Sequence, residues 1–150
     1  MSSERSEAPP FLEVCRDLLT SEFAIRFQAS GESMYPTIRD GEFIEVAPLG
    51  CGREPRRGDI VLYESAGRLV CHRLVRLGGA PLFPGFVLQG DARWAGEESV
   101  LAGQALGVAT AVMRNGSRRR LRGWVARFRD ASRRLAGSVR RTLIGSSLPV

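Results

Sequence analysis

The sequence contains no lysine, since all 22 of its Lys and Arg residues are arginine, and it contains a single histidine, His72. A guanidinium stays protonated in proteins, so arginine cannot serve as a general base. An imidazole has a pKa of about 6.5 and accepts a proton readily near neutral pH. Any reaction that needs an ordinary nitrogen base therefore depends on His72.

Long apolar runs are also absent: no stretch of about 18 or more apolar residues occurs, as a membrane-spanning helix would need. The N-terminus has no apolar segment typical of a secretory signal. Cys15, Cys51 and Cys71 are odd in number and widely spaced, without the Cys-x-x-Cys pair typical of zinc or redox sites. We expect no cofactor or metal, and a cytoplasmic protein or one peripheral on a membrane surface.

Acidic residues are scarce near the C-terminus. Residues 1–113 hold 11 Arg and 15 acidic residues, whereas residues 114–150 hold 11 Arg and one acidic residue, Asp130. Apolar residues recur at helical spacing from Leu121 to Leu143, which predicts an Arg-rich amphipathic helix within 117–150. This helix either packs on the domain or lies on an anionic membrane surface; nucleic acid is not the expected partner, because an Arg-rich tail alone is unspecific.

The length of 150 residues and the 43% hydrophobic content suit one modest domain with tails. A polar tail and short helix are expected over 1–22, a β domain over 23–116, and the basic segment over 117–150. Short alternating segments separated by Gly, Pro and Asp turns predict an all-β barrel or sandwich. The expected strands lie at 23–28, 43–46, 60–63, 69–77, 86–89 and 106–113.

Four short motifs follow one another in the β region. They read Gly31-Glu32-Ser33-Met34-Tyr35-Pro36-Thr37, then Arg57-Gly58-Asp59, then His72-Arg73, then Gln89-Gly90-Asp91. In this order they resemble the boxes of type I signal peptidases and of the related self-cleaving repressor peptidases, over roughly residues 23–113. Four boxes in order are far more specific than any single motif.

The resemblance implies that Ser33 is the nucleophile and that His72, which stands where many relatives have lysine, is the general base. A serine hydroxyl needs such a base to take its proton as it attacks. Histidine at this position resembles the archaeal and endoplasmic-reticulum branch, in which an aspartate of a Gly-Asp box supports it. Asp91 is then the orienting carboxylate, with Glu97 or Glu98 as alternatives.

The resemblance also suggests how substrate and oxyanion are held. Gly31 stands where many signal peptidases have a second serine, so we expect an oxyanion hole made mainly of backbone, chiefly the N–H of Ser33. Met34 and Tyr35 are expected beside the substrate, Tyr35 at the rim of the cleft. Cys71 is a weaker candidate nucleophile, because neighbouring residues of a strand point to opposite faces.

These observations predict a serine endopeptidase that cleaves a leader or signal segment from a precursor peptide, with small residues preferred beside the scissile bond. A self-cleaving regulator is a second hypothesis, although no Ala-Gly or Cys-Gly pair lies upstream of Ser33. A third is a non-catalytic relative that binds an extended peptide at a sheet edge.

Overall fold

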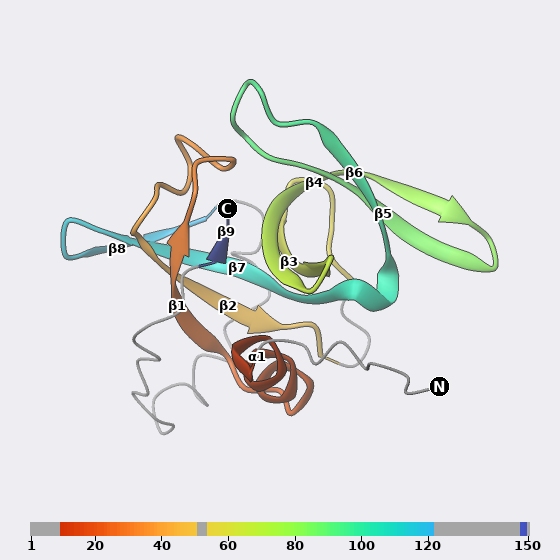
Figure 1. Cartoon of the computed structure of the whole chain (residues 1–150), viewed down its shortest axis with the longest axis horizontal. Coiled ribbons are helices and arrows are strands. Elements are labelled where there is room, and N and C mark those ends of the chain that lie inside the picture. The colour runs from red at the N-terminus through yellow and green to blue at the C-terminus, as the bar shows by residue number, and fades with distance from the viewer. Residues whose placement is uncertain (1–9, 51–53, 122–147, 150) are drawn as a thin grey trace, which may run out of the picture.

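The computed structural model describes residues 10–50, 54–121 and 148–149, mainly as one antiparallel sheet with a short helix. The elements are α1 (Pro10–Thr20), β1 (Ile25–Ser30), β2 (Phe43–Pro48), β3 (Ile60–Ser65), β4 (Arg68–Ala80), β5 (Phe83–Gln89), β6 (Glu97–Leu101), η1 (Ala102–Gln104), β7 (Ala105–Arg114), β8 (Ser117–Arg120) and β9 (Leu148–Pro149). The strand order is β6-β5-β4-β3-β7-β2-β1-β9, with β8 paired to β7. The sheet curls without closing (Figure 1), which confirms the all-β prediction.

The curl of the sheet brings together strands that are far apart in the strand order. β1 and β4 are separated by β2, β7 and β3, yet they meet at the site described below. Register shifts in β2 between Glu45 and Val46 and in β3 between Leu62 and Tyr63 are irregularities of the kind that increase local twist. They fall between β1 and β4 in the strand order, where added twist bends the sheet toward closure.

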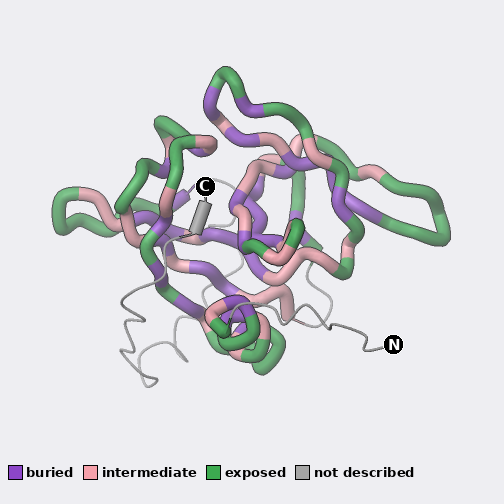
Figure 2. The backbone as a smooth tube through the Cα atoms, viewed as in Figure 1, coloured by how far each residue is buried: buried purple, intermediate pink, exposed green. Residues whose placement is uncertain are grey.

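The interior is divided into two clusters of buried side chains. The larger one includes Phe27, Ile44 and Leu62, and the smaller one includes Val61, Tyr63 and Leu88. Because Val61, Leu62 and Tyr63 alternate between these clusters, β3 is buried on both faces. Figure 2 shows this central part of the sheet as buried backbone and the outer loops as exposed.

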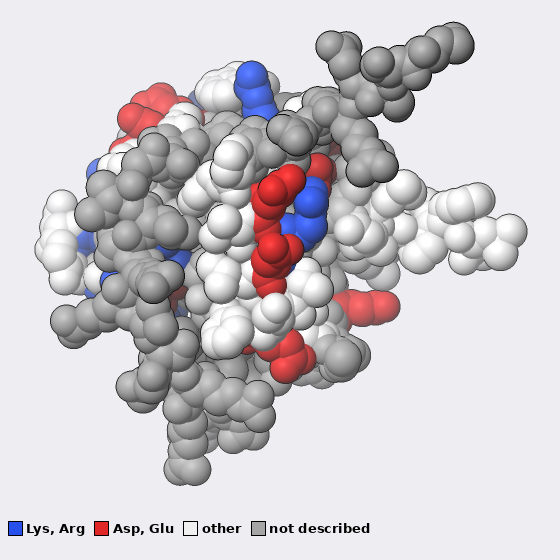
Figure 3. Space-filling view, turned by 60° about the horizontal axis from the view of Figure 1, so that its bottom comes forward, with Lys and Arg blue, Asp and Glu red and all other residues white. Residues whose placement is uncertain are grey.

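The hairpin of β4 and β5 projects beyond the core and carries no charge at its end. Residues 77–88 contain no charged side chain, and Leu82 and Phe83 are 86% and 66% exposed. This end forms the white projection at the right of Figure 3. It is therefore an apolar surface on solvent, a feature typical of interaction sites.

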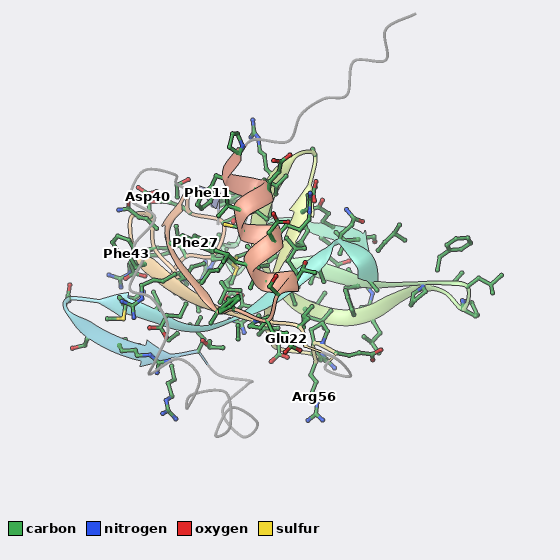
Figure 4. The ribbon with its side chains drawn as sticks, turned by 90° about the horizontal axis from the view of Figure 1, so that it is seen from below. Phe11, Glu22, Phe27, Asp40, Phe43 and Arg56 are labelled. Carbon is green, nitrogen blue, oxygen red and sulfur yellow. The ribbon has the colours of Figure 1, made fainter. Side chains whose placement is uncertain are left out.

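Helix α1 forms where the sequence predicted it and covers one side of the curled sheet. Its buried residues are Leu12, Cys15 and Leu19. Phe11 packs edge-on against Phe27 of β1, with ring centroids 6.2 Å apart, and Figure 4 shows the two rings between helix and sheet. The helix thereby holds β1 in place, and β1 leads directly to Ser33.

The basic segment 117–150 begins with a strand that was not predicted. Residues 117–120 form strand β8, antiparallel to β7. The turn between them is Asn115-Gly116, with φ values of 50° and 73°, the positive values that a two-residue hairpin turn needs. An Asn-Gly hairpin therefore extends the sheet to Arg120, just before the helical spacing begins at Leu121. Most of the predicted helix falls in 122–147, outside the described residues.

Candidate active site

Ser33 lies in the loop between β1 and β2, on a short turn anchored by two buried residues. Met34 and Ile38 are fully buried, and the N–H of Ile38 donates to the carbonyl of Met34 over 3.0 Å. This single helical turn fixes the loop on the core. Gly31 begins the turn with a φ of 89°, a conformation that glycine adopts without strain. Ser33 is left half-buried at the surface of the site.

His72 comes from the middle of β4, opposite Val61 of β3. Its Nε2 lies 3.0 Å from the Oγ of Ser33, although the two residues are 39 positions apart in the sequence. Burial lowers the pKa of His72, while the charges of Glu98 and Asp91 act in the opposite direction. The imidazole is therefore neutral at pH 7 and able to take a proton.

Tyr63 defines which nitrogen of His72 carries the proton. The Oη of Tyr63 lies 3.0 Å from the Nδ1 of His72 and donates to a carboxylate oxygen of Glu98 over 2.6 Å. A phenol has one hydrogen, so once it is given to Glu98 the phenol oxygen must accept from Nδ1–H. Nε2 is then unprotonated and faces the hydroxyl of Ser33, as a general base requires.

Glu98 is held in place from β6 by a second hydroxyl. Ser65, at the end of β3, donates to its other carboxylate oxygen over 2.5 Å. Burial raises the pKa of Tyr63, and the hydrogen bond to Glu98 and the negative charge of that carboxylate raise it further. Tyr63 therefore stays protonated and keeps its hydrogen bond to Glu98. Glu97 is turned outward and pairs with Arg76 on the exposed side.

Asp91 lies near the site, but its carboxylate does not occupy the expected position against Nδ1 of His72. Its two oxygens accept from the Nε and Nη2 of Arg73 over 2.7 and 2.6 Å, and it also accepts from Thr37. The reason is register: Arg73 pairs with Gln89, so its planar guanidinium meets the carboxylate just beyond the end of β5 and binds it bidentately. Tyr63 takes the predicted place at Nδ1.

The hydrogen bonds of Asp91 tie three motifs together. Burial opposes its ionisation, but the hydrogen bonds from Arg73 and Thr37 outweigh this and lower the pKa of Asp91. Arg73 also donates to the carbonyl of Gly58 over 2.6 Å. Asp91 is therefore a charged anchor that joins the serine loop to β4 and to the loop before β3.

Gly90 explains why the Gln-Gly-Asp motif needs its glycine. A Cβ at Gly90 would lie 2.4 Å from the carbonyl oxygen of Ser33 and 2.7 Å from Ala95. The same carbonyl accepts from the N–H of Ala92 over 2.9 Å. The serine loop thus rests directly on the backbone of 90–92, and this contact sets the position of Ser33 relative to His72.

The three residues expected at the oxyanion and substrate have different settings. Gly31 is exposed at the start of the turn, and Tyr35 is 50% exposed with Arg39 5.8 Å from its ring. Met34 is fully buried in the core, so it supports the loop from below. The N–H of Tyr35 donates to the carbonyl of Glu32 over 3.0 Å.

Cys71 points away from the Ser33–His72 pair. It is fully buried in the larger core cluster, while His72 faces Tyr63 on the other side of β4. Burial raises the pKa of the Cys71 thiol far above neutral, so it carries no thiolate. Within the residues that the structure describes, no three His, Cys, Asp or Glu side chains gather as a metal site would need.

The mainly antiparallel sheet with one short helix is consistent with the fold of a class of β-rich serine peptidases. A family model described as Peptidase S24-like matches residues 4–83, more than half of the sequence, and the chain belongs to this family. The matched region contains both Ser33 and His72, whereas Asp91 and Glu98 lie beyond it. This family is related to signal peptidase I. Membership in it supports the interpretation of the chain as a serine peptidase or as a self-cleaving repressor-type relative.

No curated protein and no solved structure matches the chain. Among the described residues, no helix is both long and apolar enough to cross a membrane.

Proposed function

We propose that the protein is a serine endopeptidase that removes a leader or signal segment from a precursor peptide, with Ser33 as nucleophile and His72 as general base. The observation that carries this proposal is the 3.0 Å contact between Ser33 Oγ and His72 Nε2. The hydrogen bond from Tyr63 to Glu98 supports the tautomer in which Nε2 carries no proton. A base at that distance is in reach of the proton it must remove.

The reaction follows from these positions. As Ser33 Oγ bonds to the scissile carbonyl carbon, its proton moves to Nε2 and the carbonyl electrons move to oxygen, beside the Ser33 N–H. Collapse of this intermediate breaks the C–N bond, and His72 gives its proton to the leaving amine. A water then attacks the ester and loses a proton to His72. As the bond between the acyl carbon and Ser33 Oγ breaks, His72 returns this proton to Oγ, and the acid leaves with Ser33 restored.

Tyr63 and Glu98 assist when His72 becomes an imidazolium. The phenol oxygen accepts the Nδ1 hydrogen throughout, and the carboxylate of Glu98 lies directly behind it at 2.6 Å. The developing positive charge therefore meets a dipole backed by a negative charge. In this mechanism Tyr63 and Glu98 are positioning residues, and Asp91 acts by holding Arg73 and the serine loop.

The test compares cleavage of synthetic leader peptides with small residues at the candidate bond. Wild type should release two fragments detectable by mass spectrometry, and Ser33→Ala and His72→Ala should each lose activity by a factor of about 10³ or more. Ser99→Ala, at an exposed serine on β6, is the matched control and should be unchanged. Equal rates in wild type and His72→Ala would refute the assignment.

Self-cleavage is the second candidate function, because the family includes repressor-type relatives. Incubating the purified chain alone at several concentrations separates the two. An intramolecular cut appears at a rate independent of protein concentration and is absent in Ser33→Ala. A chain that stays intact while it cleaves added peptide acts in trans.

We further propose peripheral contact with an anionic membrane through the basic segment 117–150. Its described start, β8, carries three exposed arginines, and such clusters are attracted to anionic lipid by about 1 kcal/mol per residue near the surface. The chain should sediment with vesicles containing phosphatidylserine and not with neutral vesicles in low salt. Equal sedimentation with both would contradict the proposal.

A further inference from the structure

The strand β9 lies between β1, which leads to the nucleophile, and β4, which carries His72. Leu148 pairs with Ala29 and Pro149 with Ser30, in parallel. β9 also comes within 8 Å of β4 between Cα atoms, and β4 carries His72. Figure 1 shows β9 in the space between β1 and the β3–β4 side of the sheet. A segment from the C-terminal end of the chain thus lies where Ser33 and His72 converge.

The direction of β9 is informative. Because its pairing with β1 is parallel, its chain runs the same way as β1, toward the loop that holds Ser33. A serine nucleophile attacks the carbonyl of the residue before the scissile bond, so the acyl side of a substrate must run from N- to C-terminus toward the serine, with its C-terminal residue nearest the hydroxyl. Residues 148–149 therefore follow the path of the acyl side of a bound peptide.

The edge of β1 provides the means of binding. In the strand order β1 is the last strand before β9, so without β9 it would present unpaired N–H and C=O groups to an added peptide. Within the residues that the structure describes, β9 pairs with this edge through Leu148 and Pro149, and Pro149 has no N–H to donate. Such a segment can fill the edge and still be displaced.

We propose that the edge of β1 beside Ser33 is a binding site for the acyl side of an extended peptide, and that residues 148–149 of the same chain occupy it and compete with substrate. This rests on the proposed function of Ser33 and His72. The occupant is in the same chain, so its effective concentration is on the order of mM. If it fills the site about three quarters of the time, the apparent KM for a substrate rises about fourfold.

The activity test compares the full chain with a variant that ends at Ser147. The variant should show a KM about fourfold lower with kcat changed by less than about twofold, since only access to the site changes. A peptide of residues 144–150, added in trans, should inhibit the variant competitively, whereas a peptide of the same composition in scrambled order should not. An unchanged KM together with no inhibition would overturn the proposal.

A binding test separates this proposal from the proposed function, because it needs no catalysis. In a Ser33→Ala background, fluorescence anisotropy should show the labelled 144–150 peptide binding the full chain about fourfold more weakly than the chain that ends at Ser147. Binding to neither or equally to both overturns the occupancy, even if the enzyme is active. Binding as expected without any peptidase activity would instead refute only the proposed function.

A third measurement uses the full chain in case the shortened one does not fold. Residues 30 and 149 lie directly opposite each other, and paired residues of neighbouring strands are within the Cα separation that a disulfide spans. The double variant Ser30→Cys, Pro149→Cys should form a disulfide between these positions under mild oxidation, mapped by mass spectrometry. Crosslinks that avoid position 149, with Cys51 as the competing thiol, would contradict the pairing.

Discussion

Replacing Tyr63 by phenylalanine tests the arrangement that makes His72 a base. The change removes only the hydroxyl that accepts from Nδ1 and donates to Glu98. A hydrogen bond to a charged group is worth about 1.5–3 kcal/mol, and the imidazolium forms as the transition state is reached. At about 1.36 kcal/mol per tenfold change in rate, kcat should fall roughly 10- to 150-fold while KM changes little.

The tautomer of His72 can be observed directly, because the chain has one histidine. Long-range ¹H–¹⁵N correlation spectra of the wild type should show the proton on Nδ1 at pH 8, and Tyr63→Phe should show a mixture or the Nε2–H form. The matched control is Ser65→Ala, which removes the other hydrogen bond to Glu98 without touching His72. It should keep the Nδ1–H form and lose less than about tenfold in kcat.

Two outcomes would refute this reasoning. One is a wild-type spectrum with the proton on Nε2, since that nitrogen could not then accept from Ser33. The other is a Tyr63→Phe enzyme with full kcat and an unchanged spectrum, at a melting temperature that shows it is folded. Either result would remove Tyr63 from the mechanism and reopen the question of what orients the imidazole.

Three further predictions concern the same region. Gly90→Ala should lower kcat/KM by about 10²-fold, since the new Cβ displaces the carbonyl of Ser33. Gly96→Ala is the control and should leave kcat/KM unchanged, because Gly96 has open space around it. Equal kcat/KM values in the two variants would contradict this prediction. Asp91→Asn should lower the free energy of unfolding, measured in urea, by about 1.5–3 kcal/mol, because the charged hydrogen bonds between Asp91 and Arg73 are only partly exposed. The variant should lose less kcat than Tyr63→Phe. Full stability would refute the anchoring role of Asp91. Since burial lowers the pKa of His72, the rate should be constant above pH 7 and half-maximal below about pH 6.5; a half-maximal rate near pH 8 would contradict this. The contribution of His72 to the free energy of unfolding should decline as the pH falls below about 6.5, because the unfolded chain takes up the proton first.

Local patterns in the sequence were enough to predict the all-β class and helix α1, because each depends on residues close together in the chain. The proximity of Ser33 and His72 followed from ordered motifs and a missing lysine. Which carboxylate serves His72 depends instead on strand register and on competition. Arg73 binds Asp91 with two parallel hydrogen bonds, and no spacing rule shows that it captures this group first.

Tyr63 and Glu98 were harder to find for a related reason. Tyr63 lies in a strand buried on both faces, where a tyrosine is indistinguishable by pattern from a core aromatic residue. Glu98 belongs to β6, a strand that the sequence pattern did not predict. One signal was available, namely that a buried phenol usually requires a hydrogen-bond partner. The Asn115-Gly116 dipeptide likewise signalled the hairpin to β8, a strand that was not predicted.

The curl of the sheet has a consequence for how this protein fails. Three strands separate β1, which leads to Ser33, from β4, which carries His72, in the hydrogen-bonded order of the sheet. The meeting of Ser33 and His72 therefore depends on the curl of the sheet as well as on the contacts of the serine loop with residues 90–92. Peptidase activity then reports on the overall shape of the sheet. A distant substitution that straightens β2, β7 or β3 would abolish activity although Ser33 and His72 are both unchanged.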